Sequence, residues 1–220
     1  MRQRGLRSTA IRIARAVGLL IVLACVGACG NPSKNPIRLG TIAAVYEGGD
    51  VQGAVQQLTA YLGQYPRDDL AWTILGHAHE DLDQDDEART AYDRALAINP
   101  RRFEAINGLG ILHRKRGDDD AAMDAYRRAL AIEPGYAQAY SSMTVVALRL
   151  HRDVEALEYA RKGYELDKTD PATAANLAVA YHYNGDAANR DRLTKIAGQL
   201  GYRKGDRLRQ IYDGTLTVRK

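Results

Sequence analysis

The residues that could do chemistry are few, and their spacing argues against a reaction. The five histidines form no ligand set: His77, His79, His113, His151 and His182. His77 and His79 are two residues apart, so on a helix they point in different directions and cannot share a metal ion. The sequence also has no Gly-x-Ser-x-Gly elbow and no phosphate-binding glycine loop. We therefore predict no catalytic residue, no cofactor and no metal site.

Both cysteines, Cys25 and Cys29, lie near the N-terminus, behind a segment of unusual composition. Residues 1–15 carry five arginines and no acid, and residues 16–28 form an unbroken apolar run of 13 residues. A membrane-spanning helix needs roughly 17 to 25 apolar residues. A basic stretch before a short apolar run is typical of a signal peptide, which we expect at residues 1–28 of an exported protein.

The end of this run, Val26-Gly27-Ala28-Cys29, resembles the lipobox of bacterial lipoproteins. The resemblance implies that Cys29 is lipidated, that residues 30–34 form a short tether, and that the chain is anchored to a membrane in the cell envelope. Gly30 in place of Asp implies the outer membrane, facing the periplasm. Val22-Leu23-Ala24-Cys25 competes, but bulky Leu23 stands where a small residue is preferred. An ordinary signal peptide with two incidental cysteines remains the alternative.

The net charge of +4 comes from the signal peptide. Removing its five arginines from 31 basic residues leaves 26, against 27 acidic residues. Nothing then favours a nucleic-acid partner. Residues 190–220 remain basic, with nine cations against three acids, and we expect them to be a solvated face or a contact for acidic partners or anionic lipid.

A sequence repeat with a period of 34 residues organises the chain after the tether. Eight positions recur with the same size class in two consecutive copies. In the first copy they are Trp72, Leu75, Gly76, His79, Ala88, Tyr92, Ala95 and Pro100. In the second they are Ile106, Leu109, Gly110, His113, Ala122, Tyr126, Ala129 and Pro134. Each copy predicts two amphipathic helices, joined by a Gly/Asp turn and ended by proline.

This series is similar to the signature of tetratricopeptide repeats (TPRs). Extending the register gives five units: 35–68, 69–102, 103–136, 137–170 and 171–204. In the first unit, residues 38–47 match the signature poorly, and the sequence leaves their helix open. Residues 205–220 are expected to be a basic C-terminal cap or tail, with a short helix at 207–212. His79 and His113 occupy the aromatic signature position, where we expect packing between helices.

The resemblance implies an all-α, right-handed superhelical solenoid whose first helices line a concave, peptide-binding groove. Its inward-facing positions include Glu104, and those that we predict to bind a partner are Thr73, His77, Asn107, Ile111, Arg114, Ser141, Val145, Leu148, Asn176 and Val179. This groove is polar on its N-terminal side and apolar on its C-terminal side. Asparagines would bond the backbone of an extended peptide, and aliphatic residues would take its side chains.

These patterns favour a membrane-anchored scaffold that binds proteins during envelope assembly, similar to the TPR lipoproteins that assist pilus or secretin assembly. An adaptor that recruits cell-wall hydrolases or synthases is the alternative. An enzyme whose site forms only on oligomerisation is a third hypothesis, and it lacks any catalytic motif in the sequence.

Overall fold

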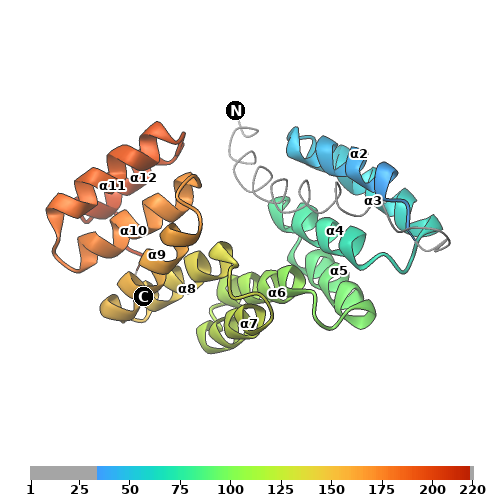
Figure 1. Cartoon of the computed structure of the whole chain (residues 1–220), viewed down its shortest axis with the longest axis horizontal. Helices are drawn as coiled ribbons and strands as arrows, with labels where there is room; N and C mark the ends of the chain where they lie inside the picture. Colours follow the sequence, from blue (N-terminus) through green and yellow to red (C-terminus); the bar gives the residue numbers. More distant parts are fainter. Residues whose placement is uncertain (1–33, 219–220) are drawn as a thin grey trace. The chain divides into compact units, whose positions relative to one another are not determined.

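The computed structural model describes residues 34–218, which are helical throughout and contain no strand (Figure 1). The helices are α2 (Pro36–Glu47), α3 (Val51–Gln64), α4 (Asp69–Asp81), α5 (Asp85–Ile98), α6 (Phe103–Arg116), α7 (Asp119–Ile132), α8 (Ala137–Arg149), α9 (Asp153–Leu166), α10 (Pro171–Tyr183), α11 (Ala187–Gln199) and α12 (Gly205–Tyr212). The predicted signal peptide, Cys29 and residues 30–33 of the tether lie outside the described residues. Between Leu109 and Gly110 the chain divides into two compact units, and α6 contributes residues to both.

In the N-terminal unit, residues 34–109, helices α2 to α5 pack in sequence order, each against the next. The segment 38–47, which the sequence left open, is helical and forms most of α2. Pro36 starts this helix, where its missing N–H costs nothing. The Asn35 side chain caps it by accepting a hydrogen bond from the Arg38 N–H at 3.1 Å.

The helices end where the prolines and the Gly/Asp turns predicted. α3 ends two residues before Pro66, α5 ends two residues before Pro100, and α7 ends two residues before Pro134. Proline disfavours a helical conformation in the residue before it, which accounts for this repeated stop. At the first turn, Gly49 adopts a φ of 91°, and Asp50 caps α3 by accepting from the Gly53 N–H at 2.9 Å.

The core of the N-terminal unit depends on glycines that accept an aromatic ring. A Cβ added at Gly76 would lie 2.5 Å from the Tyr92 ring, and one added at Gly108 would lie 2.3 Å from it. Tyr92 is fully buried between these two backbones. The recurring glycine at position 76 therefore lets α4 and α5 approach each other closely.

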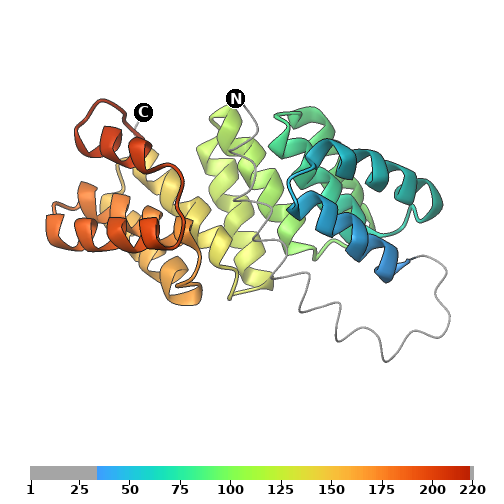
Figure 2. The ribbon, with the colours of Figure 1, turned by 90° about the horizontal axis from the view of Figure 1, so that it is seen from above.

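In the C-terminal unit, residues 110–218, helices α7 to α11 again pack in order, and α10 contacts α8 as well as α9. The expected short helix after residue 204 is present as α12, which packs on α10 and α11 at the red end of the ribbon in Figure 2. Its Leu208 and Ile211 join the apolar cluster that contains Leu148 and Val179. α12 therefore covers apolar surface that the last repeat would otherwise leave exposed.

Candidate peptide-binding face

The predicted groove residues divide into a buried and a half-exposed set. Seven are buried: Thr73, His77, Asn107, Ile111, Ser141, Leu148 and Val179. Three are half-exposed: Arg114, Val145 and Asn176. Only the second set offers side chains to a partner without rearrangement of its surroundings. All three lie in the C-terminal unit.

In the N-terminal unit, the buried polar residues of α4 bond to the protein itself. The Thr73 hydroxyl donates to the Asp69 carbonyl oxygen at 2.7 Å. His77 Nδ1 lies 2.8 Å from the Tyr92 hydroxyl, which donates to Glu80 Oε2 at 3.0 Å. Because a hydroxyl has one proton, this arrangement makes His77 Nδ1 the donor to Tyr92 Oη.

Burial has a direct consequence for His77. It lowers the pKa of the His77 imidazole to about 4, so the ring is neutral at pH 7. The sequence placed His79 and His113 between helices and His77 on the groove face. In the structure, His77 is deeply buried, whereas His79 and His113 are half-buried. His79 Nδ1 lies 2.6 Å from Gln84 Oε1 in the turn before α5, which keeps that ring near the surface.

Asn107 on α6 is unlike these residues. It is fully buried, and neither its side-chain nitrogen nor its side-chain oxygen has a hydrogen-bond partner among the described residues. One turn earlier, Glu104 has one carboxylate oxygen, Oε2, that is also buried without a partner. Most buried polar atoms in native proteins are paired, so these three atoms indicate a place where a partner is missing.

In the C-terminal unit, the buried groove positions serve the core. Leu148 and Val179 pack with Leu208 and Ile211, and Ile111 packs with Met143 and Val146. These aliphatic side chains are already covered by the chain itself. Their assignment as contacts for a ligand's apolar side chains remains a prediction that would require α12 or a neighbouring side chain to move.

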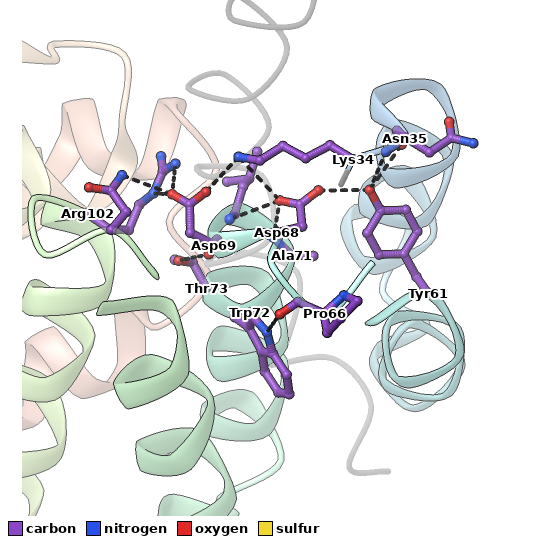
Figure 3. Close-up of polar contacts among 12 residues, drawn as sticks. Lys34, Asn35, Tyr61, Pro66, Asp68, Asp69, Ala71, Trp72, Thr73 and Arg102 are labelled. Atoms are coloured by element: carbon purple, nitrogen blue, oxygen red, sulfur yellow. Dashed lines mark hydrogen bonds and ion pairs between the residues drawn. The ribbon is translucent and has the colours of Figure 1, made fainter. Parts of the chain in front are cut away.

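A polar cluster at the start of α4 was not found by sequence reasoning (Figure 3). Asp69 Oδ1 accepts from Lys34 Nζ at 2.7 Å, and Oδ2 accepts from Asn99 Nδ2 at 3.0 Å and from Arg102 Nε at 2.9 Å. Asp68 beside it caps α4 and accepts from the Tyr61 hydroxyl at 2.8 Å. Although burial alone would raise the pKa of Asp69, the bonds from Lys34, Asn99 and Arg102 hold it well below its usual range.

The spacing of this cluster was visible in the sequence. Lys34, Asp68 and Arg102 are each 34 residues apart and precede the first helices of three consecutive repeats. Stacked repeats bring equivalent positions close together, so both cations approach the start of α4. Lys34 lies 4.0 Å from Asp68, whereas Arg102 bonds the neighbouring Asp69. The signature positions drew attention to apolar residues, and this charged position lay outside them.

Other chemistry is limited in the part of the chain that the structure describes. Within residues 34–218, no group of three or more His, Cys, Asp or Glu side chains is arranged to hold a metal ion. Over the same residues, no helix has the length and apolar character needed to cross a bilayer.

Comparison with protein families identifies the repeat. The tetratricopeptide repeat profile matches residues 42–102 and 75–137. The search of curated protein sequences found no relative of this chain. The all-α arrangement of consecutively packed helices is that of a TPR solenoid, as the sequence predicted.

Solved structures support the same fold. A thermophilic TPR protein of Thermus thermophilus is 20% identical, with a TM-score of 0.68 over 81% of this chain and 96% of that one. PilF of Pseudomonas aeruginosa is 18% identical, with a TM-score of 0.64 over 81% and 84%. YrrB, described as a TPR protein with an unusual peptide-binding site, is 16% identical, with a TM-score of 0.52 over 92% and 100%. At these identities the likeness concerns the fold alone.

Proposed function

We propose that this protein is a lipid-anchored scaffold of the cell envelope that holds an extended segment of a partner protein on the first-helix face of its repeats. One observation carries the proposal: Arg114, Val145 and Asn176 stay half-exposed at first-helix positions, while the signature residues around them are buried. Together they offer a guanidinium, an aliphatic surface and an amide. Such a mixture suits a peptide, because a peptide presents a polar backbone and apolar side chains together.

The comparisons support the binding role in part. YrrB, whose fold is similar, has a peptide-binding site. The likeness to PilF is compatible with an envelope assembly role of the pilus or secretion type, although it extends to the fold alone. The proposal for this chain rests on its own half-exposed residues and on its N-terminal sequence.

The anchor sets where the partner would meet the scaffold. With Cys29 lipidated, residues 30–34 reach at most about 16 to 18 Å when fully extended. Lys34, at the end of that tether, is bonded to Asp69 in the N-terminal unit. The first repeat would therefore lie close to the outer membrane on its periplasmic side, and partners would have to come to the membrane surface.

Site-specific photocrosslinking in intact cells tests both parts. Photoreactive residues are placed at Val145 and Asn176 and, as a control, at Arg128, which is exposed on the second helix α7. The same cells carry either the native chain or Cys29→Ala and receive a clickable fatty acid. We expect a discrete partner band from Val145 and Asn176 but not from Arg128. Lipid label should be present in the native chain and lost in Cys29→Ala.

The crosslinked band tests the binding surface, and the lipid label tests the anchor, so either part of the proposal can be rejected without the other. Equal trapping from all three positions, or trapping from Arg128 alone, would move the binding surface away from the first helices. Lipid label that persists in Cys29→Ala would transfer the anchor to Cys25, and label absent from both chains would reject a lipoprotein.

A further inference from the structure

The three unpartnered polar atoms on α6 share one face of the helix. Glu104 and Asn107 are three residues apart, which places their side chains on the same side. Gly108, next to Asn107, lies against the Tyr92 ring, which binds His77 and Glu80 of α4. The unmet atoms are two acceptor oxygens and one N–H₂ donor group. A ligand that completes them must supply donors to both oxygens and an acceptor to the amide.

The charges around Glu104 indicate which donor is missing. Three carboxylates, those of Asp68, Asp69 and Glu104, face two cations, Lys34 and Arg102. Arg102 donates to Asp69 through Nε at 2.9 Å and also through its NH2 group, whereas its NH1 group stays 3.7 Å from Glu104 Oε1. Arg102 therefore bonds Asp69 at closer range and forms only a longer ion pair with Glu104, so these three carboxylates share two cations.

Two further features agree with this interpretation. Burial raises the pKa of the Glu104 carboxyl, although the nearby Arg102 opposes the shift. Lys34 shows that an ammonium group can enter this cluster, since it reaches Asp69 from 35 residues away while its own side chain stays 44% exposed. A second cation from a partner would meet the same kind of environment at Glu104.

We propose that the N-terminal unit recognises a lysine or arginine side chain of the partner segment, with Glu104 as the contact for the cation and Asn107 as the contact for the main-chain amide beside it. This inference rests on the proposed function, because it names the residue type that the peptide must carry. Glu104 is the first contact, since 16% of its side chain is exposed, but its Oε2 atom is buried. Oε2 and the fully buried Asn107 therefore become available to a partner only when the side chains that cover them shift.

A random peptide display library tests this specificity. The full chain, purified in mild detergent, is used to select 12-residue peptides, and residue frequencies are compared with the input library. The variants are Glu104→Gln, which keeps the shape and removes the charge, and Asn107→Leu. The matched control is Glu87→Gln, an exposed glutamate on α5 of the same unit.

The native chain and Glu87→Gln should enrich peptides with a lysine or arginine at one position, and Glu104→Gln should lose that enrichment. Asn107→Leu should bind the selected peptides at least tenfold more weakly, yet its Tm should equal or exceed that of the native chain, since it removes an unpaired buried amide. Peptides enriched without a basic bias, or a bias that survives Glu104→Gln, would overturn the inference and leave peptide binding intact. Failure of the native chain to enrich any peptide would reject both.

Discussion

The two units use the same repeat but are stabilised in different ways. In the N-terminal unit, buried tyrosines carry directional bonds: Tyr46 donates to Asp81 at 2.6 Å and Tyr61 donates to Asp68 at 2.8 Å. In the C-terminal unit, the buried first-helix residues Leu148 and Val179 are aliphatic and pack with Leu208 and Ile211 of α12. The same helical repeat therefore supports a charged, pH-sensitive N-terminal unit and an apolar C-terminal unit whose last helix, α12, covers part of its core.

The difference matters for binding because the two units offer different groups to a partner. The N-terminal unit has buried polar atoms on α6 that lack partners. In the C-terminal unit, the aliphatic residues Leu148 and Val179 are already packed in the core. In our proposals, Glu104 gives the N-terminal unit its specificity, and Val145 and Asn176 give the C-terminal unit a shallow contact surface.

The strongest test of the comparison is Leu148→Ala. Leu148 is 2% exposed within the α8–α10–α12 cluster, so its truncation should destabilise the C-terminal unit by about 2 to 5 kcal/mol. The chain's single tryptophan, Trp72, packs against the core of the N-terminal unit and reports on that unit alone. In urea titrations of Leu148→Ala, the helical circular dichroism signal should be lost at a lower urea concentration than in the native chain. The urea midpoint of the Trp72 fluorescence transition should shift less.

Val154→Ala is the control, because Val154 is 68% exposed in the same unit and should change stability little. If both signals shift together in Leu148→Ala, the two units unfold as one and the division at residue 109 has no energetic meaning.

His77 provides the pH test of the N-terminal unit. Its folded pKa of about 4 lies below the ordinary histidine value of about 6.5, so the unfolded chain binds the proton first as pH falls. The contribution of neutral His77 to the free energy of unfolding is fully present above about pH 6.5. As the pH falls from there to about 4, on the order of 3 kcal/mol of this contribution is lost.

Urea unfolding followed by Trp72 fluorescence at pH 7 and pH 4.5 measures this loss, with His77→Gln as the comparison. The variant should be less stable at pH 7 but lose much less stability on acidification, because glutamine does not titrate. If the native chain and the variant lose the same stability between pH 7 and pH 4.5, groups other than His77 cause the pH dependence.

The sequence predicted the helix pairs well because their cause is local and periodic. Small residues at Gly76 and Gly110, and prolines after the second helices, act on neighbours within one repeat or the next. Burial at groove positions was not predictable in the same way. Whether Leu148 faces solvent depends on α12, some 60 residues away, and whether His77 is exposed depends on Tyr92 across the helix pair. The bond between Lys34 and Asp69 was missed because these charged residues lie outside the signature positions that define the repeat.

The smallest expected effect compares one repeat position in the two units. Asp50 and Asp118 both stand at the N-cap of a second helix, yet only Asp50 accepts a hydrogen bond from its helix, at 2.9 Å from the Gly53 N–H. Asp118 makes no such bond and instead lies 3.7 Å from His113. Asp50→Ala should therefore cost about 1 kcal/mol, whereas Asp118→Ala should cost a few tenths. Thermal unfolding of the two single variants at pH 7 measures the difference. Equal losses would mean that the Asp118 side chain turns to cap α7 in solution.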